Sequence, residues 1–196
     1  MIDRRADTMY FAKAGPHNRE TTLALARERA DDLGIEHIIV ATTSGETGAM
    51  ATEVMGERHV VVVSHSTGFG APNEQSLTDE NRGVIEAAGG RILTCQHALG
   101  GVGRAVRRKL GSYQVDEIMA FTLRNFCEGI KVACEITVMA ADAGLVPASE
   151  EVIAIGGTGR GCDTAAVLLA ANAQDFFELR VLEIICKPRI GGRLHR

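Results

Sequence analysis

The stretch HIIVATTSGETG, residues 37–48, holds the pattern from which the fold can be predicted. Its first half is a short run of apolar, mostly β-branched residues, which is typical of a strand buried in a parallel sheet. Its second half is a polar turn with two glycines, and a helical stretch follows from Ala49 to Met55 and ends at Gly56. A buried strand that runs through a polar turn into a helix is the repeating unit of an α/β fold.

The same unit recurs along the chain, which predicts a largely parallel sheet covered by helices on both faces. The last two predicted strands lie close together in sequence, which leaves room for one of them to run antiparallel. The further strands are predicted at residues 59–63, 91–95, 151–155, 165–170 and 181–186. The further helices are predicted from Asn18 to Leu33, from Thr78 or Asp79 to Ala88, in a basic segment that ends at Leu110, and over residues 116–144 with a break near Arg124–Asn125.

Length and composition indicate one globular domain over residues 1–196, of which the polar residues 1–8 are expected to be mobile. The net charge is −4, no basic stripe crosses the chain, and aromatic residues make up only 4% of it. Nucleic acid is therefore not an expected partner, because single strands need a positive groove and aromatic platforms.

Membrane and secretory segments are not expected either. The sequence contains no apolar run of about 18 residues, the length that a membrane span needs, and no apolar segment follows the charged N-terminus as it would in a secretory signal. The five cysteines are an odd number without paired spacing. We therefore expect free thiols and a cytoplasmic protein.

Four polar loops that contain glycine follow predicted strands, beginning near residues 42, 64, 96 and 156. In an open parallel sheet, ligands bind in the crevice beyond the carboxyl ends of the strands. Because all four loops fall at that edge, we expect them to form one site for a small phosphate-bearing ligand.

The first of these loops, Thr42–Gly48, has the strongest features of a phosphate site. Backbone N–H groups at the start of the following helix favour an anion, and glycines allow the backbone to approach it closely. Glu46 weighs against an anion unless its side chain points away, and an ordinary helix cap is the alternative. The hydroxyl groups that can donate to phosphate oxygens are those of Thr43, Ser44 and Thr47.

The loop Gly156–Thr164 matches neither common nucleotide motif. No Lys-Ser/Thr pair follows Gly161 as in a Walker A loop, and Cys162 stands where the dinucleotide fingerprint has its last glycine. Its glycines still predict a backbone that approaches something closely. Asp163 could accept a hydrogen bond from a ribose-like or ribityl hydroxyl, or it could form an Asx-turn in a purely structural loop.

His65 and His97 each follow a predicted strand, so both are expected to face the same crevice. Either could donate to a phosphate or act as a general acid or base, and ordinary hydrogen bonding within the loop is the alternative. No ligand spacing supports a metal site. Cys162 could be reactive at a helix N-terminus, but a small filler in the interior is the simpler interpretation.

Motifs along nearly the whole chain, from Met9 to Arg189, resemble those of stand-alone proteins of the pyruvate kinase alpha/beta domain family. The matching stretches are YFAKAGPHNRETTLALARERA (10–30), VATTSGETG (40–48), SHSTGFGAPN (64–73), QHALGGVGRA (96–105), EGIKVACEITVMAADAGLVP (128–147), IGGTGRGCDTA (155–165) and LEIICKPR (182–189). The resemblance implies a three-layer α/β/α fold like the C-terminal domain of pyruvate kinase. It also implies that the barrel domain with the kinase active site is missing, so pyruvate kinase activity is not expected.

The resemblance further implies a bound flavin mononucleotide (FMN) and self-association into a homo-oligomer. By analogy with the effector-phosphate loop of the kinase domain, the phosphate would be held by Thr42, Thr43, Ser44, Gly45 and Thr47. The other strand-end loops would line the rest of the cofactor through His65, Gly157, Thr158, Gly159 and Asp163.

Three functions remain open at this point. The chain could be a flavoprotein, with oxidoreductase activity as one form. It could be a non-catalytic sensor of a phosphorylated metabolite. It could also be a small enzyme acting on a phosphorylated substrate, with His65 or His97 as the acid or base.

Overall fold

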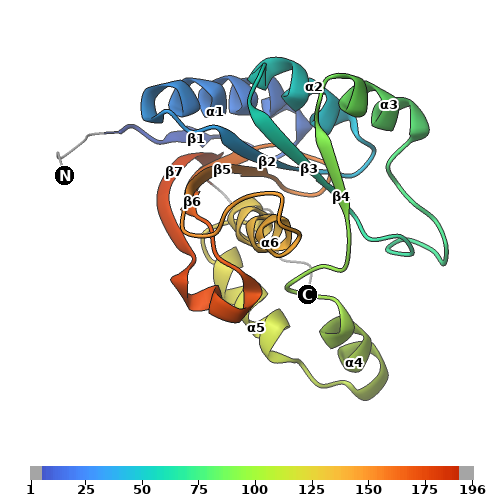
Figure 1. Ribbon diagram of the computed structural model, residues 1–196. Helices are drawn as coiled ribbons and strands as arrows, with labels where there is room; N and C mark the ends of the chain where they lie inside the picture. Colours follow the sequence, from blue (N-terminus) through green and yellow to red (C-terminus); the bar gives the residue numbers. More distant parts are fainter. Residues whose placement is uncertain (1–5, 190–196) are drawn as a thin grey trace.

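The computed structural model describes residues 6–189, which form one seven-stranded sheet with helices on both sides (Figure 1). The strands are β1 (Met9–Phe11), β2 (His37–Thr42), β3 (His59–Ser64), β4 (Arg91–Thr94), β5 (Glu151–Gly156), β6 (Thr164–Leu169) and β7 (Arg180–Pro188). The helices are η1 (Pro16–Asn18), α1 (Arg19–Leu33), α2 (Glu46–Met55), α3 (Asp79–Ala87), α4 (Val102–Leu110), α5 (Val115–Arg124), α6 (Glu128–Asp142) and η2 (Ala173–Glu178).

The sheet has the order β1-β7-β6-β5-β2-β3-β4 and is mostly parallel. Neighbouring strands run parallel except on either side of β6, which is antiparallel to both β5 and β7. The mainly parallel sheet is thus confirmed, and the antiparallel strand is one of the last two. We did not predict β1, because its three residues are too few to show either an alternating or a continuous apolar pattern.

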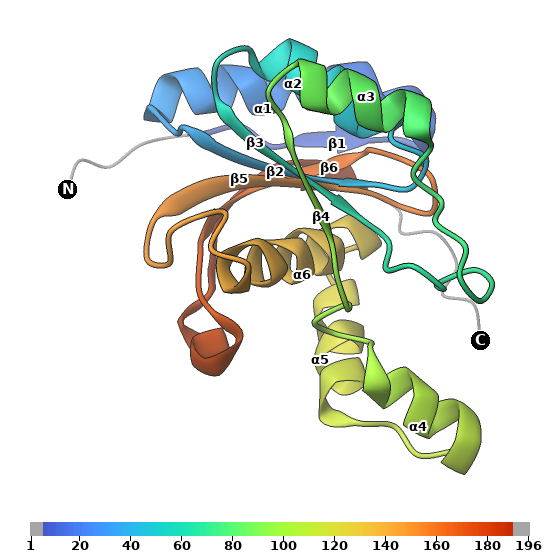
Figure 2. The ribbon, with the colours of Figure 1, turned by 45° about the vertical axis from the view of Figure 1, so that its right-hand side comes forward.

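Helices α1, α2 and α3 cover one face of the sheet, and α6 lies against the other (Figures 1 and 2). The connections that lead to β2, β3 and β4 all progress in one direction across the sheet, so right-handed crossovers place their helices on the same face. The chain then returns to β5, which brings α6 to the opposite face. Helices α4 and α5 precede α6 and extend away from the sheet on that side (Figure 2). This is the expected three-layer α/β/α fold.

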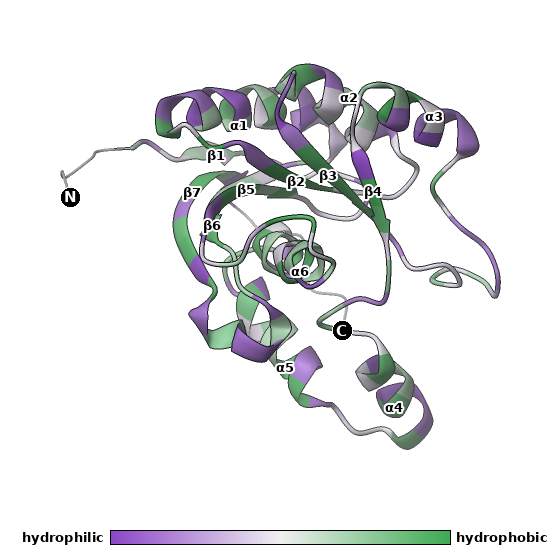
Figure 3. Cartoon of the chain, in the orientation of Figure 1, coloured by the Kyte–Doolittle hydropathy of each residue, from purple (hydrophilic) through white to green (hydrophobic). Residues whose placement is uncertain are grey.

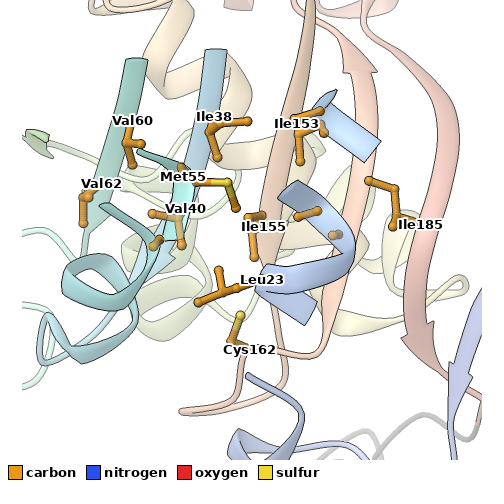
Figure 4. Close-up of a cluster of buried hydrophobic side chains, with 14 of the residues drawn as sticks. Leu23, Ile38, Val40, Met55, Val60, Val62, Ile153, Ile155, Cys162 and Ile185 are labelled. Atoms are coloured by element: carbon orange, nitrogen blue, oxygen red, sulfur yellow. The ribbon is translucent and has the colours of Figure 1, made fainter. Parts of the chain in front are cut away.

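The two faces explain why the strands are continuously apolar. Ile38 and Val40 of β2 pack under α1 and α2 with Leu23 and Met55 (Figure 4), whereas Ile39 packs toward α6. Successive side chains of a strand point to opposite faces, so a sheet with two covered faces needs apolar residues at every position. Figure 3 accordingly shows the central strands as mainly hydrophobic.

Two boundaries matter for the site. Helix α2 begins at Glu46, three residues before the predicted Ala49, so the turn that precedes it is short. The predicted break near Arg124–Asn125 separates α5 from α6. The prediction that residues 1–8 are mobile falls largely outside the described chain, because residues 1–5 are not described. Within the described part, the Thr8 hydroxyl donates a hydrogen bond of 2.8 Å to the carbonyl of Ile184.

Candidate functional site

The loops that follow β5, β2, β3 and β4 meet along one edge of the sheet. These four strands are neighbours and run parallel, so their carboxyl ends lie side by side. The hydroxyls of Ser64 and Thr94 join the ends of β3 and β4 through a hydrogen bond of 2.6 Å. The connections from β2 and from β5 leave in opposite directions, and such a switch point opens a crevice for ligands in α/β folds.

Helix α2 begins at this edge with backbone N–H groups that no helical bond uses. Its N-cap is Gly45, whose φ of 105° favours glycine. The N–H of Gly45 donates to the Thr42 hydroxyl at 3.1 Å. A Cβ on Gly45 would lie 2.4 Å from Cβ of Asn81, so the turn is pressed against α3. The next N–H groups, of residues 46–48, lack partners within the helix, and such donors at a helix N-terminus favour an anion.

Arg19, the first residue of α1, places a positive charge beside this helix terminus. Its Nη2 lies 3.3 Å from Oε2 of Glu46, and the Glu46 side chain is 61% exposed. The carboxylate of Glu46 is thus directed to Arg19 and solvent. Nε of Arg19 is buried and has no hydrogen-bond partner among residues 6–189. Sequence reasoning missed Arg19, because an arginine in the first turn of a helix is usually a solvated surface residue.

The residues expected to hold a phosphate differ in their access to a ligand. Thr42 and Thr47 are buried, and the Thr42 hydroxyl already accepts a bond from the turn. Thr43 and Ser44 are partly exposed. The carbonyl of Ser44 accepts from the N–H of Thr78 at 3.1 Å, which anchors the turn to the start of α3. Thr43 and Ser44 therefore carry the accessible hydroxyls of this loop.

The carboxylate of Asp163 is taken up by the chain itself. The side chain is fully buried. One oxygen accepts from the N–H of Gly15 at 2.9 Å and of Thr158 at 3.4 Å, and the other accepts from the Thr164 hydroxyl at 3.0 Å. Asp163 thus ties the segment before α1 to the loop between β5 and β6, and it faces the interior rather than the crevice.

The glycines of the β5–β6 loop approach other parts of the backbone. A Cβ on Gly157 would lie 2.3 Å from the carbonyl oxygen of Gly161, and one on Gly161 would lie 2.9 Å from Gly15. The close approach expected here is therefore found within the protein. Thr158 is partly exposed and Gly159 is exposed, so ligand contacts from these two residues stay a prediction.

A cavity of about 630 Å³ lies beyond the ends of β3 and β4. One of its lining residues is Thr78, which contacts Ser44, so the cavity adjoins the turn before α2. Its volume is within the range of small-molecule pockets, about 300–1,000 Å³. The lining is mostly polar and consists of Thr67, Gln75, Leu77, Thr78, Asp79, Arg82 and Thr94.

His65 and His97 come together, as their positions after neighbouring strands predict. Their ring centroids are 5.6 Å apart, and the ring of Phe69 stacks on both, at 4.2 Å from His65 and 5.0 Å from His97. The guanidinium of Arg104 lies over Phe69 at 5.1 Å. Burial lowers the pKa of His65, and the charges of His97 and Arg104 act in the same direction. His65 is therefore neutral near pH 7.

A buried ion pair on α6, between Lys131 and Glu135, contacts His97. Oε2 of Glu135 contacts Nζ of Lys131 at 2.5 Å and Nδ1 of His97 at 3.5 Å, and Oε1 accepts from the N–H of Leu99 at 2.9 Å. Burial alone would raise the pKa of Glu135, but His97 and Lys131 together lower it to about 2. Sequence reasoning missed this pair, because oppositely charged residues four apart on a helix are typical of an exposed face.

The remaining candidates have structural positions. Cys162 is buried, and burial raises the pKa of its thiol to about 12, which makes it the interior filler and not a reactive thiolate. Across residues 6–189, no cluster of three or more histidine, cysteine, aspartate or glutamate side chains is arranged to hold a metal ion. Within the same range, every helix is too short or too polar to cross a membrane.

Similar solved structures include pyruvate kinases from Cryptosporidium parvum. Two are 12% identical, with TM-scores of 0.41 and 0.39, and each match covers 78% of this chain. A third, a complex with ADP, is 11% identical with a TM-score of 0.38 over 84% of this chain. The matches cover 22–23% of those kinases, so this chain spans less than a quarter of their length.

A family model described as "Pyruvate kinase, alpha/beta domain" matches residues 20–168. That match extends from α1 to β6, and the chain therefore belongs to the pyruvate kinase alpha/beta domain family.

Proposed function

We propose that this chain binds FMN along the carboxyl-end edge of its sheet, with the phosphate at the N-terminus of α2. The observation that carries the proposal is the guanidinium of Arg19, whose Nη2 lies 3.3 Å from Oε2 of Glu46 in the first turn of α2, where the N–H groups of residues 46–48 have no helical partners. A phosphate could accept hydrogen bonds from both and from the hydroxyl of Ser44. Such charge-assisted bonds are the strong ones in proteins.

The start of α3 supports this choice of terminus by contrast. Its N-cap, Thr78, already accepts from the N–H of Asn81 at 3.2 Å, and its first turn contains the acidic residues Asp79 and Glu80. Two carboxylates at a helix N-terminus satisfy its dipole and repel an anion. At α2 there is one carboxylate, and Arg19 pairs with it.

The rest of the edge fits the remaining parts of FMN. The cavity beyond β3 and β4 offers the hydroxyl of Thr67, which suits the hydroxyls of a ribityl chain. Two other polar groups there already have partners, since the Gln75 amide bonds to His65 and Leu77 and the Thr94 hydroxyl bonds to Ser64. The identity of the ligand as a flavin comes from the family resemblance of the sequence motifs. A bound flavin would supply electron transfer, so an oxidoreductase is the form of enzyme that this proposal allows.

The first experiment asks whether the purified protein carries or takes up flavin. We expect flavin absorption bands in the protein as isolated, or saturable quenching of flavin fluorescence when FMN is added. Riboflavin, which lacks the phosphate, should bind at least about tenfold more weakly, a difference of about 1.4 kcal/mol. A protein that neither contains FMN nor binds it would refute the proposal.

The second experiment tests the phosphate position with variants. Arg19→Gln and Ser44→Ala should each weaken FMN binding by about tenfold or more, because each removes a hydrogen bond to a charged group. Arg27→Gln on the same helix is the matched control, since Arg27 donates to the carbonyl of Val54 and not toward α2's first turn. If binding of FMN falls while binding of riboflavin is unchanged, the affected residue contacts the phosphate.

A sensor of a phosphorylated metabolite is the second candidate, because the same anion site could bind the phosphate of a molecule that contains no flavin ring. Calorimetry against sugar bisphosphates and nucleotides separates the two functions. Tight binding of one of these together with weak binding of FMN would favour the sensor.

Self-association and a cytoplasmic location complete the proposal. Helix α4 has no buried residue, and large apolar side chains of the α4–α5 region are exposed, among them Val102, Leu110, Val115 and Ile118. A second copy of the chain would cover them, and light scattering after gel filtration would measure its presence. The five free cysteines support a reducing compartment.

A further inference from the structure

The basic side chains of helix α4 divide between two faces of the helix. Arg107 faces α5, where its Nε donates to Oε1 of Glu117 at 2.8 Å. Gly103, four residues earlier, lies on the same face, because a Cβ there would be 2.3 Å from Oδ1 of Asp116. The acidic residues at the start of α5 therefore balance only the face of α4 that is turned toward α5.

The opposite face of α4 lines a cavity of about 370 Å³. The lining residues follow one stripe of the helix, because steps of three and four residues return to the same face. Gly101 and Ala105 have little or no side chain, which leaves room on this stripe. The cavity volume lies within the range of small-molecule sites, about 300–1,000 Å³. Its charged lining consists of Arg104, Arg108 and Lys109.

These three cations lack a negative partner. Across residues 6–189, no ion pair or hydrogen bond joins any of them to a carboxylate, in contrast to Arg107 of the same helix. The lining of the cavity contains no acidic residue either. Arg104 and Arg108 are four residues apart, and like charges at that spacing repel each other on a helix. An anion in the cavity would relieve a repulsion that this part of the protein leaves unbalanced.

Arg104 is restrained, but its hydrogen-bond donors are free. Its guanidinium lies over the ring of Phe69 at 5.1 Å, and its Nη2 would lie 2.9 Å from a Cβ on Gly100. A side chain restrained in this way loses less freedom when a ligand binds. Within the described chain, no hydrogen bond uses its N–H groups. They can therefore donate to a phosphate, which a guanidinium binds through two parallel hydrogen bonds.

We propose that this cavity, the α4 groove, binds a small ligand with two or more linked phosphate groups. A single phosphate carries about two negative charges near neutral pH, so three cations match two linked phosphates better than one. A long polyanion such as nucleic acid is disfavoured, because the net charge of the whole chain is −4. The α4 groove shares no residue with the FMN phosphate position at α2, and the proposal does not rest on that function.

The experiment titrates the whole chain with inorganic tripolyphosphate in a calorimeter. Arg104→Gln and Arg108→Gln should each weaken binding by about tenfold, because each removes charge-assisted hydrogen bonds. Arg91→Gln is the control, since it removes the same charge from an exposed arginine of β4, and its affinity should stay within about twofold of wild type. Inorganic monophosphate should bind at least about tenfold more weakly than tripolyphosphate.

Arg19→Gln separates the α4 groove from the proposed FMN site. It should leave tripolyphosphate affinity within about twofold of wild type. Loss of tripolyphosphate binding in Arg19→Gln, with Arg104→Gln and Arg108→Gln unchanged, would overturn the α4 groove and leave the site at α2 standing. Failure of tripolyphosphate to bind would also overturn it, as would tighter binding of an oligoglutamate peptide through the same two arginines, which would indicate a protein partner. Failure of FMN alone to bind would refute only the proposed function.

Discussion

The two glycine-rich loops at this edge have similar compositions, but their polar atoms have different partners. The loop before α2 leaves the N–H groups of residues 46–48 without helical partners. In the loop between β5 and β6, Asp163 accepts from Thr158, and the N–H of Gly161 donates to the carbonyl of Thr158 at 2.9 Å. Glycine content therefore shows that a backbone is approached closely. The partners of the remaining donors show whether the chain itself makes this approach, as it does in the second loop.

The largest expected effect comes from removing the carboxylate that holds the second loop. Asp163→Ala should lower the free energy of unfolding by about 3 kcal/mol, because it leaves buried donors of Gly15 and Thr158 unpaired. Urea denaturation measures this loss, and the exposed Asp175→Ala serves as the control. FMN affinity of the folded variant should stay within about twofold of wild type. A stable variant with lost affinity would instead make Asp163 a ligand contact, and the contrast between the loops would fail.

Two glycines of the second loop separate close packing from backbone conformation. Gly157→Ala should cost about 2–3 kcal/mol, because its Cβ would lie 2.3 Å from a backbone oxygen that cannot move freely. Gly159→Ala should cost only about 1 kcal/mol, because its surroundings are open and only its φ of 64° disfavours a side chain. Equal losses in urea denaturation would contradict the packed arrangement of this loop.

Mild acid tests a third loop at this edge, the one after β3, because this loop contains a histidine and neither glycine-rich loop does. The pKa of His65 lies below its ordinary value of 6.5, because burial disfavours the charged form. At and just below pH 6.5 the unfolded chain binds more protons, so stability falls as the pH is lowered through this window. We expect His65→Asn to reduce this loss of stability and His17→Asn to leave it unchanged, as measured by urea denaturation at about pH 7.5 and in mild acid. A pH dependence unchanged in His65→Asn would contradict the burial of this ring.

The smallest effect on stability is expected at Glu46, the acidic residue of the first loop's helix. Glu46→Gln should change the free energy of unfolding by about 0.5 kcal/mol or less, because its pair with Arg19 is largely exposed. It should tighten FMN binding by about two- to threefold, since a negative charge leaves the helix terminus and Arg19 loses a competing partner. Glu53→Gln, at the other end of α2, is the control. Weaker binding would mean that the phosphate does not lie here.

The fold could be predicted largely because its strands carry a local signal. Runs such as HIIVA (37–41) and EVIAI (151–155) are apolar at every position, and two covered faces require that pattern. β1 lacked the length for such a signal. The start of α2 at Glu46 was missed because Thr-Gly sequences favour turns unless the tertiary contacts of Gly45 with α3 hold the helix start.

The sequence predicted where Ser44, His65 and His97 lie, because each closely follows a buried strand, but a ligand contact from any of them stays a prediction. Lys131 and Glu135 have the spacing of a surface ion pair, and only their contacts with Leu99 and His97 distinguish them. Asp163 shows the reverse case. A carboxylate in a polar loop suits a ligand, but folding turns it inward to backbone donors that are distant in sequence.

The pairing of β1 with β7 has a consequence for biosynthesis. Met9 lies opposite Cys186, and β7 fits between β1 and β6. Among the strands of residues 6–189, a ribosome delivers β1 first and β7 last, so β1 waits without its partner while the others are made, and one edge of β6 stays unpaired until β7 emerges. Exposed edges invite pairing with other chains. The nascent protein is therefore most vulnerable to aggregation just before its last strand emerges, and a chaperone would be of most use at that moment.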